Sequence, residues 1–153
     1  AYGRIPIPLW VAKRGNGPTF LLTGANHGDE YEGPLALIDL MRGLDLSRLN
    51  GRLIVIPGLN MAAYRAGTRV SPIDAVNLNR AFPGERNGTS TQMIAHYVET
   101  VLMPLADYCL DCHSGGSSLA YLPTLFALAA ADPAEAAKIE ELIAAFNPPR
   151  RCA

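Results

Sequence analysis

The sequence Thr19-Phe-Leu-Leu-Thr-Gly-Ala-Asn-His-Gly-Asp-Glu30 joins an apolar run to a polar turn. Short apolar runs bounded by glycine or proline predict β-strands that are buried on both faces. Two further runs of this kind follow, at Arg52–Pro57 and Tyr108–Cys112. We therefore expect three buried strands, each followed by a turn or loop.

Segments with helical periodicity separate these predicted strands and follow the last of them. The helical patterns cover residues 31–43, 89–103 and 132–146. Thr89 and Gln92 have the spacing of a capping box, and Asp132 before Pro133 marks a helix start. The alternation of strands and helices predicts an α/β domain, a three-layer α/β/α sandwich around a mixed, mostly parallel sheet.

The composition is that of a globular domain without a strongly charged surface. The 153 residues are 49% hydrophobic, and 13 basic against 14 acidic side chains leave a net charge of -1. This balance gives no electrostatic reason to bind nucleic acid or anionic lipid, so we expect a small-molecule partner and leave a homo-oligomer open.

The sequence also carries no signal for export or membrane insertion. No apolar run reaches the about 20 residues of a membrane span, and the start does not resemble a signal peptide. Three cysteines are too few for a disulfide framework and fit a reducing compartment. We therefore expect a cytoplasmic protein with no membrane partner.

In a parallel sheet, ligands bind beyond the carboxyl ends of the strands. Three segments follow the predicted strands directly: Gly24–Glu30, Gly58–Gly88 and His113–Ser118. The second segment is longer than a simple connection requires, so we expect it to line the site.

His27, Glu30 and His113 are the candidate metal ligands. Glu30 follows His27 by three residues at the entry to a predicted helix, where both side chains can reach one ion. Three nitrogen and oxygen ligands that leave a fourth position to water are typical of catalytic zinc. We expect one Zn²⁺ per chain, with Asp29 and Asp111 as acids that can orient the histidines.

Two other features have simpler interpretations. The residues from Cys109 to His113 spell the Cys-x-x-Cys-His pattern of haem attachment, but they lie in a strand-like run without an export signal, so we interpret the cysteines as strand residues. His96 lies inside a predicted helix, and we expect it to have no chemical role.

The stretch Asn77-Leu-Asn-Arg-Ala-Phe-Pro-Gly84 combines a guanidinium with amide side chains. The planar fork of an arginine matches a carboxylate, and an asparagine adds a directed hydrogen bond. This pattern indicates a site for an acidic end of a substrate.

Three motifs together resemble the succinylglutamate desuccinylase and aspartoacylase family, which is related to zinc carboxypeptidases. They are Gly24–Glu30, Asn77–Gly84 and Asp111–Gly116, in family order and at family-like spacing. The resemblance implies a zinc exopeptidase-like fold and hydrolysis of an N-acyl amino acid. It also implies that His27, Glu30 and His113 bind zinc, that Asn79 and Arg80 hold the substrate carboxylate, and that Arg69 polarises the scissile carbonyl.

Within the family, the segments Asn26–Gly33, Ala66–Asp74 and His113–Gly116 most resemble the deacetylases of ectoine breakdown that act on Nα-acetyl-L-2,4-diaminobutyrate. Family members are about twice as long as this chain and supply a catalytic glutamate from a later stretch similar to Glu-Leu-Gly-Gly, which this sequence does not contain. We therefore expect residues 1–153 to be the N-terminal half of a larger catalytic domain, whose general base lies outside this chain.

Two other functions remain open at this stage. A zinc carboxypeptidase that acts on peptides would use the same carboxylate clamp, and a non-catalytic module could retain the metal site without turnover. A dinucleotide-binding domain is not favoured, because no Gly-x-Gly-x-x-Gly follows the first predicted strand.

Overall fold

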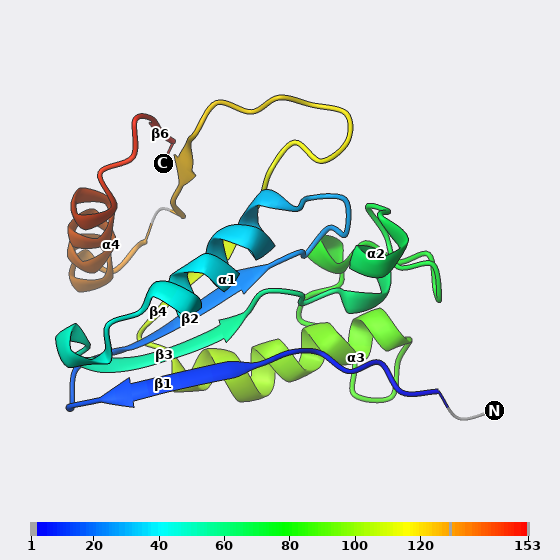
Figure 1. Cartoon of the computed structure of the whole chain (residues 1–153), viewed down its shortest axis with the longest axis horizontal. Helices are drawn as coiled ribbons and strands as arrows, with labels where there is room; N and C mark the ends of the chain where they lie inside the picture. The colour runs from blue at the N-terminus through cyan, green and yellow to red at the C-terminus, as the bar shows by residue number, and fades with distance from the viewer. Residues whose placement is uncertain (1–2, 129, 153) are drawn as a thin grey trace. The chain divides into compact units, whose positions relative to one another are not determined.

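A four-stranded mixed sheet in the order β1-β3-β2-β4 organises the larger part of the chain (Figure 1). The computed structural model describes residues 3–128 and 130–152, in one unit up to Leu119 and a second from Ala120 onward. β2 (Thr19–Gly24) pairs in parallel with both β3 (Gly51–Ile56) and β4 (Tyr108–Cys112), and β1 (Trp10–Arg14) is antiparallel to β3. The three predicted strands and the mixed, mostly parallel sheet are confirmed.

Helices cover both faces of this sheet and complete three layers. Successive strand residues point to opposite faces. On one face, Leu37 of α1 (Glu32–Gly43) packs with Leu22 and Val55. On the other face, α3 (Ser90–Tyr97) and the π-helical turn η3 (Val98–Leu102) contribute Ala95, Val98 and Leu102, which pack on Leu21, Ile54 and Ile56. The predicted α/β/α sandwich is thus confirmed for this unit.

The strands differ in burial according to their place in the sheet. β2 is buried along almost its whole length, because it lies between β3 and β4 and is covered on both faces. β4 is only partly buried and Cys109 is exposed, because β4 forms an edge of the sheet in the described part of the chain. The prediction that all three strands are buried on both faces was therefore wrong for β4.

The predicted capping box is present at the start of α3. The Thr89 hydroxyl accepts from the backbone N–H of Gln92, and the Gln92 side chain accepts from the backbone N–H of Thr89. These two bonds satisfy amide groups that the first helical turn leaves without partners. The helical path continues through η3 and η4 (Met103–Leu105), close to the predicted end.

The long segment between β3 and α3 contains short helices and is tied to the sandwich. It holds α2 (Met61–Ala66) and the 3-10 turn η2 (Leu78–Arg80). Asp74 lies between them and accepts from the backbone N–H of Thr91 at 2.7 Å, from the Thr91 hydroxyl at 2.8 Å and from the Ser90 hydroxyl at 2.9 Å. Burial alone would raise the pKa of Asp74, but these bonds lower it well below its ordinary range.

The Asp74→Asn substitution should destabilise the protein in a pH-dependent way. A lowered folded-state pKa stabilises the protein above the ordinary aspartate pKa of about 3.9, and this contribution is lost as the pH falls toward the lower folded value. At pH 7 we expect a loss of about 2 kcal/mol in the free energy of unfolding, the usual size for hydrogen bonds to a charged group. Urea unfolding at several pH values measures it.

Asp39→Asn is the matched control, because the Asp39 side chain is 79% exposed on α1. The loss in Asp74→Asn should shrink as the pH falls below about 4. An equal loss at every pH would show that the charge of Asp74 does not stabilise the loop.

The described residues of the second unit form one helix and a pair of very short strands. The helix α4 (Pro133–Phe146) begins where the sequence predicted, with the Asp132 carboxylate accepting from the backbone N–H groups of Ala134 and Glu135. β5 (Leu125–Phe126) and β6 (Arg151–Cys152) pair in parallel.

Between α1 and β3 the larger unit adds the 3-10 turn η1 (Leu46–Arg48). None of the described helices combines the length and the hydropathy needed to cross a membrane.

Candidate metal centre

The chain turns sharply where β2 ends, and this turn places the first two candidate ligands. Ala25 is fully buried and has a positive φ of 54°, a conformation that L-residues rarely adopt. Its carbonyl accepts from the N–H of Asn60, and the Gly24 carbonyl accepts from the N–H of Leu59, so the segments after β2 and β3 run together. Strained backbone of this kind is concentrated at functional sites.

Gly28 allows the turn to lie directly against α2. A Cβ atom at this position would come within 2.0 Å of the backbone carbon of Ala63, so no other residue fits without moving the helix. The glycine in this motif therefore has a packing role, because it lets the backbone next to His27 lie directly against α2.

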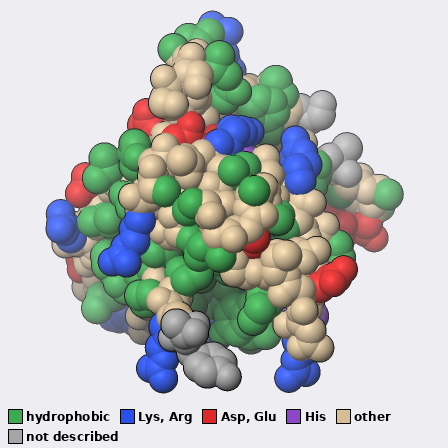
Figure 2. Space-filling view, turned by 90° about the vertical axis from the view of Figure 1, so that its right-hand side faces the viewer, with side chains coloured by type: hydrophobic (Ala, Val, Ile, Leu, Met, Phe, Trp, Pro, Cys, Tyr) green, Lys and Arg blue, Asp and Glu red, His purple; other side chains and the backbone are tan. Residues whose placement is uncertain are grey.

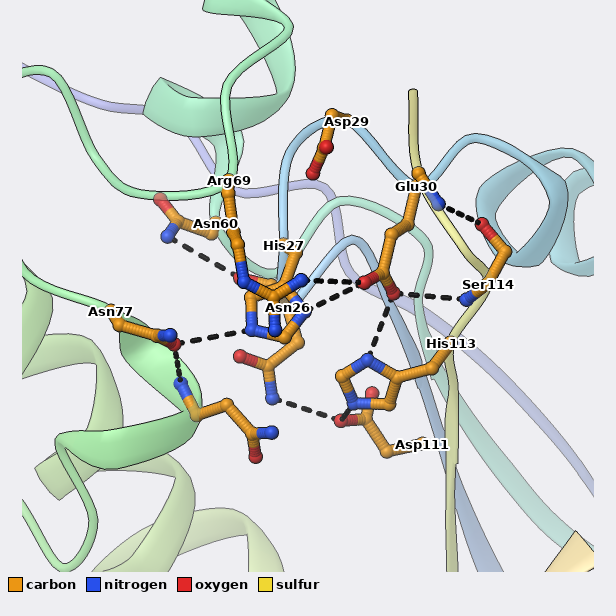
Figure 3. Close-up of polar contacts among 12 residues, drawn as sticks. Asn26, His27, Asp29, Glu30, Asn60, Arg69, Asn77, Asp111, His113 and Ser114 are labelled. Atoms are coloured by element: carbon orange, nitrogen blue, oxygen red, sulfur yellow. Dashed lines mark hydrogen bonds and ion pairs between the residues drawn. The ribbon is translucent and has the colours of Figure 1, made fainter. Parts of the chain in front are cut away.

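His27, Glu30 and His113 converge at the carboxyl ends of β2 and β4 (Figure 3). Their nearest ligand atoms all lie within 4.8 Å of one another. His27 and Glu30 are each 2% exposed, whereas the His113 side chain is 32% exposed. The centre thus has a buried side and an open side, and the structure brings together the three residues that the sequence selected.

The donor atoms of this cluster fit a divalent metal ion. Nδ1 of His27 and Nδ1 of His113 each lie 2.8 Å from an oxygen of Glu30. The two Nε2 atoms also face oxygens, that of Asn77 at 3.1 Å and that of Asp111 at 2.8 Å. Because a neutral imidazole has only one N–H, each ring must take a second proton or turn a lone pair toward Glu30. A cation among the two Nδ1 atoms and the carboxylate satisfies all of them.

Asp111 orients His113 and is itself held from two sides. Its oxygens accept from the Thr23 hydroxyl at 2.7 Å and from the Asn26 amide at 2.9 Å. Burial raises the pKa of Asp111, but the bonds with His113, Asn26 and Thr23 outweigh burial and lower it. The bond with Asp111 is in turn the main reason why the pKa of His113 is raised, against the effect of burial. The orienting role expected for Asp111 is consistent with this geometry.

Glu30 has two further partners besides the histidines. The backbone N–H of Ser114 donates to Oε2 at 2.9 Å, and the Arg69 guanidinium lies 3.4 Å from Oε1. The Arg69 side chain is 56% exposed, so its guanidinium reaches the cluster from the solvent side. An exposed cation beside the cluster is suited to contact a bound molecule.

Asn79 and Arg80 lie in η2 and are exposed. Neither side chain hydrogen-bonds to the three candidate ligands in the described part of the chain. The link is made by Asn77, whose Oδ1 faces Nε2 of His27 and also accepts from the N–H of Asn79 at 3.0 Å. Sequence reasoning placed Asn77 in a substrate loop and did not connect it with His27.

Asp29 does not orient His27, contrary to the expectation from the sequence. Its Oδ2 accepts from the backbone N–H and the hydroxyl of Ser117, both at 3.4 Å. Asp29 therefore fastens the segment after β4 to the turn after β2. A Cβ at Gly116 would come within 2.5 Å of this carboxylate, and Gly116 has a positive φ of 60°.

The cysteines of β4 lie outside the candidate ligand cluster among the described residues. Burial, with a smaller effect of Asp111, raises the pKa of the partly buried Cys112 to about 11, so this thiol stays protonated at neutral pH. The spacing of three between the two cysteines places them on opposite faces of a strand. Their interpretation as strand residues is confirmed.

Charged side chains are interspersed on the face of the molecule at which β2 and β3 end. Lysine and arginine side chains are spread over this face and do not merge into one patch (Figure 2). This distribution agrees with the balanced composition.

Comparisons with known proteins match this chain along most of its length. The model of the succinylglutamate desuccinylase/aspartoacylase catalytic domain matches residues 16–153. An N-alpha-acetyl-L-2,4-diaminobutyric acid deacetylase of Halomonas elongata is 51% identical over 123 residues, which cover 80% of this chain and 36% of that protein. The chain thus spans about a third of the length of this curated relative.

Solved structures agree with the fold. A succinylglutamate desuccinylase/aspartoacylase from Rhodobacter sphaeroides matches with a TM-score of 0.92 and 43% identity, over 98% of this chain and 46% of that one. The product-bound ectoine utilization protein EutE (DoeB) from Ruegeria pomeroyi matches with a TM-score of 0.88 and 49% identity, over 99% and 46%. A metallo-carboxypeptidase from Pseudomonas aeruginosa shares the fold at 18% identity, with a TM-score of 0.57 over 78% of this chain and 33% of that one.

Proposed function

Because the chain belongs to the succinylglutamate desuccinylase/aspartoacylase family, we propose that its protein hydrolyses the amide bond of an N-acyl amino acid at a zinc ion held by His27, Glu30 and His113. The observation that carries this proposal is the convergence of two Nδ1 atoms and one carboxylate at the ends of β2 and β4. The partial exposure of His113 lets solvent reach this side of the cluster.

A bound zinc ion would supply Lewis-acid activation of water and of the amide carbonyl. The residues of this chain orient the zinc ligands and place a positive charge beside them. Asp111 and Asn77 accept the Nε2 protons of the two histidines, so that both Nδ1 lone pairs point toward Glu30. Arg69 contributes a positive charge where the carbonyl oxygen gains negative charge.

Asn79 and Arg80 bind the substrate carboxylate in this proposal. Both are exposed, and η2 follows Asn77, which contacts His27. A guanidinium and an amide can hold a carboxylate with three or more hydrogen bonds. Asn79 and Arg80 would in this way hold the substrate with its acyl amide facing the proposed zinc ion.

The general base is assigned to no residue of this chain. Glu30 is committed to the metal, and Asp29 bonds to Ser117. We propose that residues 1–153 form part of a larger catalytic domain and that the remaining part supplies the base, since the chain covers 36% of the Halomonas relative and 46% of the solved structures.

The proposed substrate is Nα-acetyl-L-2,4-diaminobutyrate, which rests on the identity of 51% with the Halomonas deacetylase. We further propose that the protein acts in the cytoplasm, where its three cysteines, all free among the described residues, remain reduced.

A substrate screen of the whole zinc-loaded protein tests this function. We expect turnover of Nα-acetyl-L-2,4-diaminobutyrate above that of N-acetylaspartate and N-succinylglutamate, and no release of C-terminal residues from peptides. Peptide cleavage without deacylation would identify a carboxypeptidase. One equivalent of zinc without turnover of any of these compounds would identify a non-catalytic module.

A further inference from the structure

We propose that Asn77 is a positioning residue that orients His27 for the metal and couples this ligand to the Asn79–Arg80 loop. The inference rests on the proposed zinc site and concerns a residue outside the ligand set. One oxygen atom, Asn77 Oδ1, lies 3.1 Å from Nε2 of His27 and 3.0 Å from the backbone N of Asn79. Figure 3 shows both contacts meeting at this atom.

The backbone contact identifies which end of the Asn77 amide faces His27. A backbone N–H is always a donor, so the atom that it approaches must be the amide oxygen and not the NH₂ group. The same oxygen can only accept from His27. Nε2 of His27 must therefore carry the proton, and the lone pair of the neutral ring lies on Nδ1, which faces Glu30.

Burial makes this assignment costly to change. His27 is 2% exposed, so water cannot readily replace the acceptor that Asn77 provides. Without that acceptor, the Nε2–H is left unsatisfied, or the proton moves to Nδ1 and blocks the metal. Loss of partners that orient metal-bound histidines typically costs about 10- to 100-fold in metal affinity.

The two histidines are oriented by unlike acceptors. His113 faces the Asp111 carboxylate, which is anionic, whereas His27 faces a neutral amide. A neutral acceptor fixes the ring without adding negative charge beside the buried Glu30. Asn77 therefore sets geometry more than charge at this side of the centre.

The second bond of Asn77 carries the coupling to the clamp. Its side chain caps η2, the turn that holds Asn79 and Arg80. A shift of His27 must move Oδ1, and a shift of Oδ1 alters the first turn of η2. The orientation of the metal ligand and the position of the clamp are thus set by one atom.

Three substitutions at Asn77 in the whole protein separate these roles. Asn77→Ala removes both bonds. Asn77→Ser retains an oxygen that can cap η2, but this oxygen is one bond closer to the backbone and cannot reach His27. Asn77→Asp keeps an acceptor for both donors. The exposed Asn87 in the same loop supplies the control variant Asn87→Ala.

Zinc affinity, measured by competition with a chelator at fixed pH, is the first readout. We expect zinc binding to weaken about 10- to 100-fold in Asn77→Ala and Asn77→Ser, and to return to within a few-fold of the native value in Asn77→Asp. At saturating zinc, the KM for the acylated substrate should rise in Asn77→Ala and stay closer to the native value in Asn77→Ser. Thermal unfolding reports any loss of the fold.

The outcomes distinguish this inference from the proposed function. Native zinc affinity in Asn77→Ser, with the fold intact, would overturn the orienting role while the zinc site stands. Equal KM values in Asn77→Ala and Asn87→Ala would overturn the coupling. A native protein that does not bind zinc would overturn the function and this inference together.

Discussion

Replacement of His113 by alanine should abolish catalysis and weaken zinc binding strongly. Loss of a residue that only orients a ligand lowers metal affinity about 10- to 100-fold, and loss of the ligand itself should lower it further. His113 is the third candidate ligand and directly follows β4. Its Nδ1 atom lies 2.8 Å from a carboxylate oxygen of Glu30. Removal of this ring leaves two protein ligands, which do not complete a catalytic zinc site. The His113 side chain is 32% exposed, so the fold should tolerate the change.

The measurement is zinc content together with chelator competition on the purified whole protein. His27→Ala should give the same loss of zinc but also destabilise the protein, because His27 is buried and fills space beside Asn77. His96→Ala is the matched control, since this third histidine lies in α3 and should not affect zinc. Zinc affinity in His113→Ala equal to that in His96→Ala would contradict the ligand assignment.

Replacement of Arg69 by alanine should lower kcat by about 100- to 1,000-fold, the effect of removing one donor that stabilises a developing oxyanion. The guanidinium lies 3.4 Å from Glu30 and is therefore beside the proposed metal. Its side chain is 56% exposed, so its ion pair with Glu30 contributes little to stability. Zinc content and thermal stability should therefore stay close to native.

Steady-state kinetics on the whole protein checks this prediction, with Arg65→Ala as the control because Arg65 is exposed on the neighbouring helix α2. A rise in KM with unchanged kcat would mean that Arg69 contributes equally to binding the substrate and the transition state. The oxyanion role would then be wrong, although the zinc site would stand.

The three candidate ligands could be predicted from the sequence because of a general property of parallel sheets. β2 lies beside β4, so residues that follow the two strands meet at one edge. His27, Glu30 and His113 are therefore brought together although 86 residues separate the two histidines (113 − 27). Periodicity and helix caps are local signals in the sequence. They made it possible to predict the strands and the helices α1, α3 and α4.

Contacts within loops could not be predicted in the same way. His27 and Asn77 are fifty residues apart, and neither periodicity nor a cap relates them. Asp29 was expected to orient His27 from its place in the motif, but the turn directs it to Ser117. The partial burial of β4 also depends on its place at the edge of the sheet that the described residues form, and the strand order sets this place.

The helix α2 in the long loop has local sequence signals at both of its ends. Asn60 caps α2 by accepting from the N–H of Ala63, and Gly67 ends the helix with a positive φ of 63°. An asparagine before a short helical run and a glycine after it are standard helix boundaries. The segment between β3 and α3 was therefore less irregular than its length indicated.

X-ray absorption at the zinc edge of the zinc-loaded whole protein reports directly which atoms surround the metal. With His27, Glu30 and His113 as ligands, the spectrum should show only nitrogen and oxygen neighbours, at about 2.0–2.2 Å, with the outer-shell signal of two imidazole rings. A sulfur neighbour at about 2.3 Å would place the metal on a cysteine such as Cys112. That result, or a spectrum with no imidazole signal, would show that His27, Glu30 and His113 are not the three zinc ligands.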